Sequence, residues 1–309
     1  MPESGQSLKR RLKGVQNIGT ITKAMELVAA TKMRKSQELA LTSRPYAYSA
    51  LELLGVLSNL EGVTLPESLR VRPVKNTAFL LITSDKGLAG SFNSAIIRKF
   101  EQSTKSLDLH DSRYSFVAIG QKAKTYLERR KLNIIKAFVR VGDFTKIEEV
   151  EPISNFLLSN YTSGAFDRVT AFFTTFVTAL RQDVIVREFL PITYESVKES
   201  IEDTIPRAGR YSEYAKSESF LTNKSQEYII EPSPAEVLKE LAPKLLNIRI
   251  YHAILEANAS EHSARRVAMK NASDNASELS ESLNVEYNKS RQASITREII
   301  EVTSGSATI

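Results

Sequence analysis

Residues 233–243 read SPAEVLKELAP, and they open a long helical pattern at the C-terminal end of the chain. Ser233-Pro234-Ala235-Glu236 is a capping box with proline at the first helical position, which is a strong signal for a helix start. Pro243 is expected to kink the helix, but the next sixty residues contain neither proline nor glycine. A helix of sixty residues extends about 90 Å at 1.5 Å per residue. The sequence therefore predicts a C-terminal shaft helix over residues 233–309.

The N-terminal residues show a similar pattern. Apolar residues recur every three or four positions, which places them on one stripe of a helix: Leu8, Leu12, Val15, Ile18, Ile21, Met25 and Val28. Pro45 is expected to interrupt or bend this helix, because proline lacks a donor and clashes with the preceding turn. A second helical piece follows to Leu60, so residues 1–60 are expected to form an N-terminal shaft helix.

The two shaft helices are expected to pair with each other. Small side chains on the C-terminal helix favour the close approach of a neighbouring helix: alanines 253, 257, 264, 268, 272 and 276. Neither apolar stripe keeps the period of about 3.5 residues that a regular parallel coiled-coil homodimer needs. The pattern instead favours one long antiparallel coiled coil that closes over an inserted globular domain.

The middle of the chain, residues 75–197, has a different period. Five apolar runs rich in β-branched or aromatic residues have strand length: 78–83, 115–120, 134–141, 168–178 and 184–192. Helical patterns at 94–102, 121–130 and 152–161 alternate with them. This alternation predicts the α/β class, with an open Rossmann-like sheet, right-handed crossovers and a plausible antiparallel edge hairpin. Residues 198–232 are polar and without period, so a variable surface loop is expected there.

Composition limits the class of protein. A chain of 309 residues with 42% hydrophobic and 25% charged residues can build two units with real cores. It has no cysteine, which excludes disulfides, thiolate metal sites and a cysteine nucleophile. No apolar run approaches the roughly 18–20 residues that span a bilayer, and no secretory signal is expected at the N-terminus. The three histidines have no metal or triad partners at useful spacing, so no catalytic, cofactor or metal residues are expected.

The net charge of +6 is localised. Residues 1–35 contain eight cations and two anions, whereas the rest of the chain balances. A basic helical arm implies an acidic partner surface, either nucleic acid or protein. Residues 1–44 contain no aromatic side chain, which counts against a nucleic-acid scaffold. A further alternative, an α/β enzyme dimerised through its arms, predicts a polar cluster at the strand ends, and the sequence shows no nucleophile–base pair.

Three stretches resemble a known family. They are ITKAMELVAATKMRKSQ at 21–37, SDKGLAGSFN at 84–93 and EHSARRVAMKNASDNA at 261–276, the last continued by YNKSRQASITREI at 287–299. In this order, and over the whole chain, they resemble the gamma subunit of the F-type rotary ATP synthase of bacterial type. The two terminal motifs are long and specific, and the middle motif is weaker.

The resemblance implies a mechanical function. In the family the terminal helices form a shaft inside a ring of three alpha and three beta subunits, and the α/β domain sits against the epsilon subunit and the membrane c-ring. Proton or sodium flow turns this rotor, and the shaft couples its angle to the conformations of the beta catalytic sites. By resemblance there is one copy per complex, with no catalytic site or cofactor of its own and no nucleic-acid partner. It is expected as a peripheral subunit at the cytoplasmic face of the bacterial inner membrane, touching the membrane only indirectly.

The resemblance also implies contact residues. Met25, which the residues alone present as core filler of a helix pair, matches a bearing contact near an acidic beta-subunit loop. Neighbouring cations, otherwise a solvated face, would steer and hold register there. The expected contacts between rotor and ring are Lys23, Met25, Lys32, Arg34, Lys35, Arg265, Gln292, Thr296 and Glu298. Gln292 and Thr296 lie four apart and share one helix face.

Other positions match less closely or match another partner. Tyr228 and Glu231 match residues on the membrane-ring and epsilon side. Gly19, where the family usually has a polar residue, is expected to soften the shaft, and Arg266 replaces a common apolar residue.

The turn at 87–91 invites a phosphate-loop interpretation, but it lacks the Gly-Lys-Ser/Thr of a Walker loop, so a strand-to-helix turn is sufficient.

Overall fold

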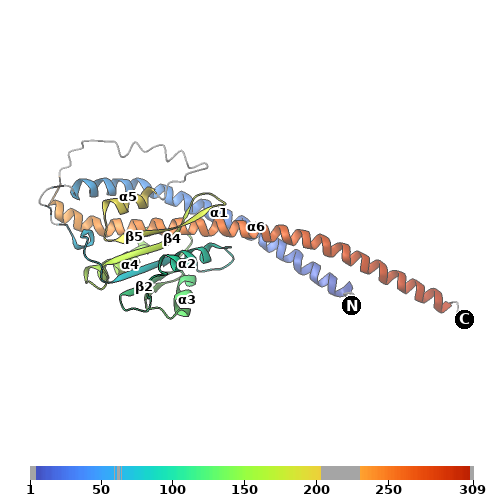
Figure 1. The fold of residues 1–309 in the computed structure, drawn as a ribbon. Helices are drawn as coiled ribbons and strands as arrows, with labels where there is room; N and C mark the ends of the chain where they lie inside the picture. The colour runs from blue at the N-terminus through green and yellow to red at the C-terminus, as the bar shows by residue number, and fades with distance from the viewer. Residues whose placement is uncertain (1–4, 59, 61–62, 64, 203–229, 307–309) are drawn as a thin grey trace. The chain divides into compact units, whose positions relative to one another are not determined.

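The computed structural model describes residues 5–58, 60, 63, 65–202 and 230–306. The chain divides into two compact units, one of Met1–Ala29 with Arg265–Ile309 and one of Ala30–Ala264. We call them the distal unit and the sheet unit, and each is described by itself. Helices α1 (Gly5–Ser58) and α6 (Pro234–Ser306) run through both units (Figure 1).

Neither proline ends its helix. Pro45 lies inside α1 and Pro243 lies inside α6, so of the interruption or bend expected at Pro45, the interruption does not occur. Proline in a helix interior costs about 3 kcal/mol. Burial of the following α1 residues Ala47, Leu51 and Leu54 in the core offsets that cost, because tertiary packing of an apolar face supplies most helical stability in proteins.

The sheet unit contains one five-stranded sheet in the order β3-β2-β1-β4-β5. Its strands are β1 (Thr77–Ile82), β2 (Tyr114–Ile119), β3 (Ile134–Phe138), β4 (Arg168–Phe176) and β5 (Gln182–Leu190). The first four are parallel, and β5 pairs antiparallel with β4. The expected α/β class and the antiparallel edge hairpin are confirmed.

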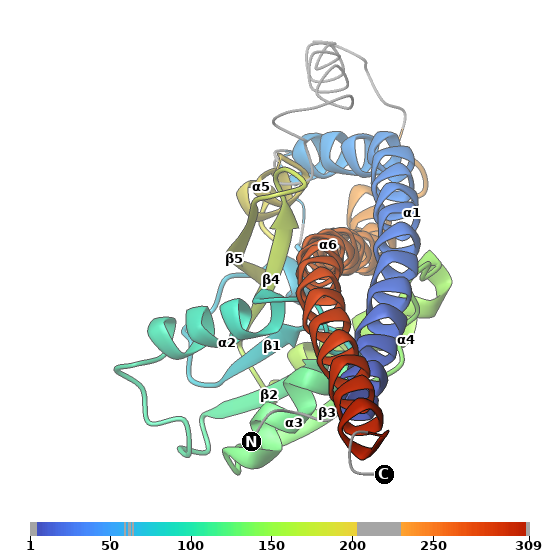
Figure 2. The same ribbon diagram turned by 90° about the vertical axis from the view of Figure 1, so that its right-hand side faces the viewer.

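Helices cover both faces of this sheet. They are α2 (Phe92–Ser103), α3 (Gln121–Arg129), α4 (Ile147–Thr162) and α5 (Tyr194–Glu202), with a short 3-10 turn at Glu67–Leu69. Figure 2 shows α2 and α3 on one face, and α4 with the α1–α6 pair on the other. On the first face Phe100 packs against Phe79, Phe116 and Phe172, with ring centroids 5.2–6.0 Å apart. On the second, Ser154 of α4 donates to Asn247 of α6.

Two helix boundaries differ from expectation. Helix α4 begins at Ile147 rather than Pro152, because the Glu149 carboxylate accepts the Lys146 N–H at 2.8 Å and caps the start. Helix α5 reaches Glu202, so the first residues of the expected polar loop are helical, anchored by buried Val197. The rest of that loop up to residue 229 lies outside the described residues.

A buried arginine fixes α6 to the end of the sheet. Arg249 donates to the carbonyl oxygens of Glu188, Phe189 and Ser196 at 2.6–3.0 Å. Burial lowers the pKa of Arg249 to about 9, which still leaves the side chain charged at neutral pH. Three carbonyl dipoles therefore stabilise one buried cation where β5, α5 and α6 meet.

The distal unit is an antiparallel helix pair. A Cβ placed on Gly5 would contact Ser290, and one placed on Gly19 would contact Ala276 at 3.4 Å, so the register runs in opposite directions along the helices. The expected apolar stripe is only partly buried. Leu8 is buried, but Ile18, Ile21 and Val28 are exposed, and Thr22, Glu26 and Ala29 are buried instead.

We expect Gly120→Ala to destabilise the chain by about 3 kcal/mol or more. Gly120 has φ 92°, and a Cβ there would lie 2.1 Å from the carbonyl oxygen of Thr83. Urea unfolding of the purified chain measures the change. Gly142→Ala is the matched control, since nothing lies within 4 Å of a Cβ at that loop position. Equal stabilities of the two variants would contradict the packing described here.

Candidate functional site

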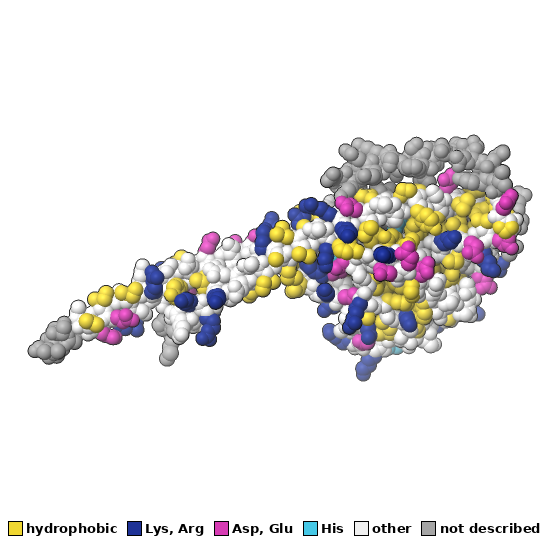
Figure 3. Space-filling view, turned by 180° about the vertical axis from the view of Figure 1, so that it is seen from behind, with side chains coloured by type: hydrophobic (Ala, Val, Ile, Leu, Met, Phe, Trp, Pro, Cys, Tyr) yellow, Lys and Arg dark blue, Asp and Glu magenta, His cyan; other side chains and the backbone are white. Residues whose placement is uncertain are grey.

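The end of α6 in the distal unit exposes an apolar surface. Every residue from 291 to 303 is exposed. Ile295, Ile299, Ile300 and Val302 each keep 48–73% of their surface accessible. Figure 3 shows hydrophobic side chains at the surface of this end. Contiguous exposed apolar side chains are a feature of interaction sites.

The N-terminal part of α1 presents a second apolar surface beside charges. Ile18, Ile21 and Val28, which share one face of the helix, are 54–58% exposed. Met25 is half-buried among them. The structure therefore places Met25 beside an exposed apolar surface rather than inside a closed core.

Lys23 carries the first of the expected contact charges. Its Nζ lies 2.9 Å from the Glu26 carboxylate, and its side chain is 60% exposed. The hydrogen bond from Lys23 lowers the pKa of Glu26, and the cations Arg266 and Lys270 of α6 add to this. Glu26 is thereby held as a carboxylate between α1 and α6, while the Lys23 ammonium remains accessible to a partner.

The expected contacts on α6 also belong to the distal unit. Gln292, Thr296 and Glu298 are exposed, and the Thr296 hydroxyl donates to the Gln292 carbonyl oxygen at 2.9 Å. Arg265 is half-buried. These side chains belong to an exposed helix and not to a cleft.

Two of the expected cations contact the protein's own β3–α4 loop, residues 139–146. Lys32 Nζ lies 2.5 Å from Asp143 Oδ2. Lys35 Nζ lies 4.4 Å from the centre of the Phe144 ring. Arg34, between them, is exposed. Sequence reasoning missed this loop, because no motif surrounds Asp143 and its contacts come from positions more than a hundred residues away.

Asp143 also reaches α6. His262 Nε2 lies 3.0 Å from Asp143 Oδ1, and the Asn258 amide donates to the carbonyl oxygens of Gly142 and Asp143 at 3.3 and 3.4 Å. Hydrogen bonds from His262 and Lys32 hold the pKa of Asp143 well below its usual range, although burial opposes them. His262, expected to have a structural role, binds a carboxylate that the sequence did not reveal.

The turn after β1 is filled by its own side chains. The Asn93 amide oxygen accepts the Ser84 N–H at 3.1 Å, and the Asp85 carboxylate accepts the Gln121 N–H at 2.9 Å. The Ser84 and Gln121 N–H groups at this end of β1 are thus engaged within the protein. This supports the strand-to-helix turn over a phosphate loop.

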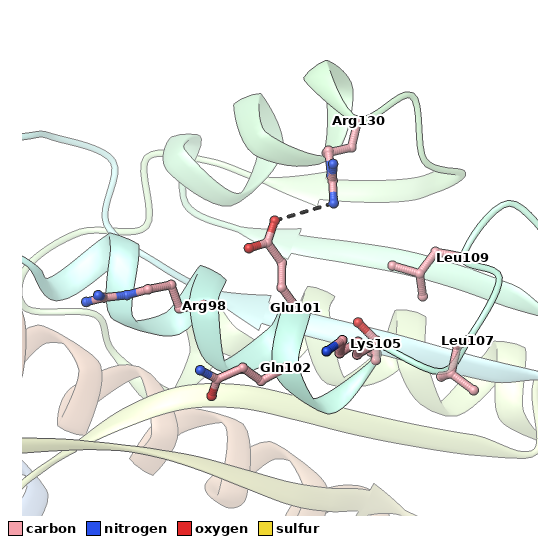
Figure 4. A pocket seen from close by; sticks show the side chains of 8 residues that line it. Arg98, Glu101, Gln102, Lys105, Leu107, Leu109 and Arg130 are labelled. Carbon is pink, nitrogen blue, oxygen red and sulfur yellow. Dashed lines mark ion pairs between the residues drawn. The ribbon is translucent and has the colours of Figure 1, made fainter.

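A hollow of about 510 Å³ lies beside the C-terminal ends of α2 and α3, away from the expected contacts (Figure 4). Its one carboxylate, Glu101, is 3.4 Å from Arg130 and accepts from Tyr126 at 2.9 Å. Burial and then Glu101 raise the pKa of Tyr126 to about 12. Glu101 is therefore held by structural partners and is not poised as a general base.

Three further observations concern the described part of the chain. Glu231 is exposed, whereas Tyr228 lies outside the described residues. Within the ranges that the structure describes, no group of three His, Asp or Glu side chains could hold a metal ion. None of the described helices is long and apolar enough to cross a membrane.

Comparison with known proteins gives the family. The sequence matches the ATP synthase family over residues 4–309. It is 36% identical to the ATP synthase gamma chain of Roseiflexus castenholzii, covering 99% of this chain and 98% of the relative. It is 35% identical to that of Moorella thermoacetica, covering 97% of each. The chain belongs to the ATP synthase gamma chain family.

Solved structures agree on the fold. The central stalk and c-ring structure of the Tetrahymena thermophila mitochondrial ATP synthase contains a chain that is 25% identical, with a TM-score of 0.56, covering 82% of this chain and 99% of that one. A chain of the Euglena gracilis mitochondrial ATP synthase rotor has a TM-score of 0.61 at 16% identity, covering 94% and 98%. The family and the rotor function expected from the gamma-chain motifs are confirmed: the chain is a rotor subunit of an ATP synthase.

We expect Asp143→Asn to lower the free energy of unfolding by about 1 kcal/mol near pH 7, a value reduced by partial exposure. The folded pKa of Asp143 is lowered, so its stabilisation is full above the unfolded pKa of about 3.9 and fades as the pH falls below that value. Urea unfolding of both proteins near pH 7 and near pH 3 tests this.

The difference between the two proteins should shrink at the lower pH. Asp274→Asn, an exposed carboxylate on α6, is the control and should behave like the unmodified chain at both pH values. A difference that stays constant from pH 7 to pH 3 would show that the charge of Asp143 is not involved.

Proposed function

We propose that the chain is the non-catalytic shaft of its ATP synthase, and that it transmits rotation to catalytic sites on an enclosing ring of alpha and beta subunits. The exposed helical end at residues 291–303 carries this proposal, because an apolar helix end needs a surrounding partner. A shaft inside a ring is contacted from all sides, which suits side chains on different faces of one helix.

The charges of α1 suit an acidic partner loop. Residues 1–35 hold the whole net charge of +6. Lys23 and Arg34 present exposed cations, and the ring contact would also include Met25 and the α6 residues Arg265, Gln292, Thr296 and Glu298. Rim charges of this kind set register and encounter rate more than they add affinity. Lys32 and Lys35 contact the β3–α4 loop in the chain itself, so a ring contact by either lysine would compete with that loop.

The partners on the other side are the epsilon subunit and the c-ring. The structures of the Tetrahymena and Euglena mitochondrial ATP synthases include a c-ring, which supports a place for this chain on such a ring. We assign Tyr228 and Glu231 to that side, and residues 1–60 with 233–309 to the shaft, 75–197 to the globular domain and 198–232 to a variable loop. One copy per complex, at the cytoplasmic face of a bacterial inner membrane, completes the proposal.

Native mass spectrometry of the complex that co-purifies with a tagged copy tests the assignment. One copy of this chain with three copies each of two larger subunits is the expected result. A homodimer without larger subunits would overturn the proposal and favour the nucleic-acid scaffold or the dimeric α/β enzyme instead.

Met25→Lys tests the bearing contact. We expect the free energy of unfolding of the chain to change by less than about 0.5 kcal/mol, because Met25 is only half-buried. Ion pumping per ATP hydrolysed should fall severalfold in the assembled enzyme, since a new cation beside an acidic loop forms an ion pair that resists rotation. Met25→Leu is the matched control, and it should couple normally. Normal coupling by Met25→Lys would exclude the bearing role.

Ile299→Cys tests enclosure of the α6 end. The chain has no natural cysteine, so within this chain a maleimide labels this position alone. Ile299 is 57% exposed in the chain, and we expect fast labelling of the free chain and slow labelling in the complex. Leu283→Cys, a position already buried by α1, should label slowly in both. Equal labelling of Ile299→Cys in both states would show that no ring covers this end.

A further inference from the structure

Within the sheet unit, one stretch of α6 is held on one side by the β4–β5 hairpin. The Glu256 carboxylate accepts from the Thr175 hydroxyl at 3.1 Å and from the Phe176 N–H at 2.8 Å. Further along the helix, Ser263 donates to the Ala179 carbonyl oxygen at 2.7 Å and accepts from Gln182 at 3.4 Å. Glu256 and Ser263 are both buried.

The β3–α4 loop holds the same stretch on another side. Asn258 and His262 of α6 both contact Gly142–Asp143, as described above. The same loop contacts Lys32 and Lys35 of α1. One carboxylate, Asp143, therefore links the loop to both long helices.

The two sets of contacts lie on different faces of α6. At 100° per residue, Glu256 and Ser263 of the hairpin side fall within roughly 20° of each other. Asn258 of the loop side lies roughly 160° from Glu256 around the helix, and His262 lies roughly 120° from it. The hairpin and the loop thus act from different directions on two helical turns.

These polar contacts lie at the edge of the apolar core. The core contributed by α6 extends from Leu238 to Ala257, and that of α1 begins at Ala40. Beyond this range fewer interdigitated apolar side chains oppose rotation of the helix, so polar contacts contribute more of the resistance there. Hydrogen bonds and ion pairs weaken steeply when their geometry changes, and paired contacts on different faces oppose rotation in either sense.

We propose that the β4–β5 hairpin and the β3–α4 loop form a two-sided lock that prevents α6 from rotating about its own axis relative to the sheet. The lock transmits torque between the sheet domain and the shaft, and Asp143 is its positioning residue. Transmission of torque rests on the proposed shaft function, whereas the lock itself is a property of this chain alone.

The first experiment uses the assembled complex. The ring is fixed to a surface, the rotor is held by a non-hydrolysable nucleotide, and a probe is attached to Lys105→Cys, an exposed position on the sheet domain. The angular variance of the probe is inversely proportional to the torsional stiffness of the rotor. Asp143→Ala with Asn258→Ala removes the loop side, and Glu256→Gln with Ser263→Ala removes the hairpin side.

Each pair of substitutions should widen the angular variance by less than twofold, because the contacts of Arg249 and His252 also contribute to the stiffness. Asp143→Asn alone, which keeps one acceptor oxygen, should have a smaller effect. Lys244→Ala, an exposed position on the same helix, is the control and should leave the variance unchanged. A loop-side variant with the variance of the control, although its ATP hydrolysis is normal, would overturn the lock.

The second experiment does not need the ring. Hydrogen exchange of the Phe176 amide, which donates to Glu256, reports the hairpin side in the full chain. The loop-side variant should speed this exchange severalfold, because α6 loses its contact with the loop. Unchanged exchange would overturn the lock even if a ring assembles, and faster exchange would support it even if no ring is found.

Discussion

The rest of the structure depends on a helix that has no free face. Over Ile248–Ala257 every residue of α6 is buried, between the sheet and α1. A helix buried on all sides must satisfy its polar groups internally, because water cannot reach them. This helix packs against the sheet, α4, α5 and α1. Its apolar residues belong to the same hydrophobic cluster as theirs.

The polar residues on that helix show how the constraint is met. Arg249 binds three carbonyl groups, His252 lies 2.8 Å from the Ser43 hydroxyl of α1, and Glu256 accepts two hydrogen bonds from β4. At its position along the helix, each of these side chains fixes the orientation of α6 about its own axis through directional hydrogen bonds. Alanine or leucine could not make such bonds. The polar groups therefore specify the register of the helix, whereas its apolar neighbours supply most of the burial.

The sequence predicted what local patterns determine. The capping box at Ser233, the strand-length apolar runs and the terminal motifs placed the long helices, the sheet and the family correctly. It did not predict that α1 continues through Pro45, because that depends on distant packing. The faces of α1 were also partly misassigned, since Ile18 and Ile21 are exposed whereas Thr22 and Glu26 are buried. The Asp143 contacts could not be predicted, since Lys32, His262 and the loop meet only in the folded protein. The contacts with other subunits stay predictions.

The exposed end of α6 has a consequence for how the protein is made. A free copy carries uncovered isoleucines and valine on an otherwise polar helix, which favours self-association whenever unassembled chains accumulate. Under the proposed shaft function, cells that make this subunit need to keep its supply matched to the supply of the ring subunits. Surplus free chain would form aggregates or be degraded, and so the abundance of the partners would set the usable amount of this protein.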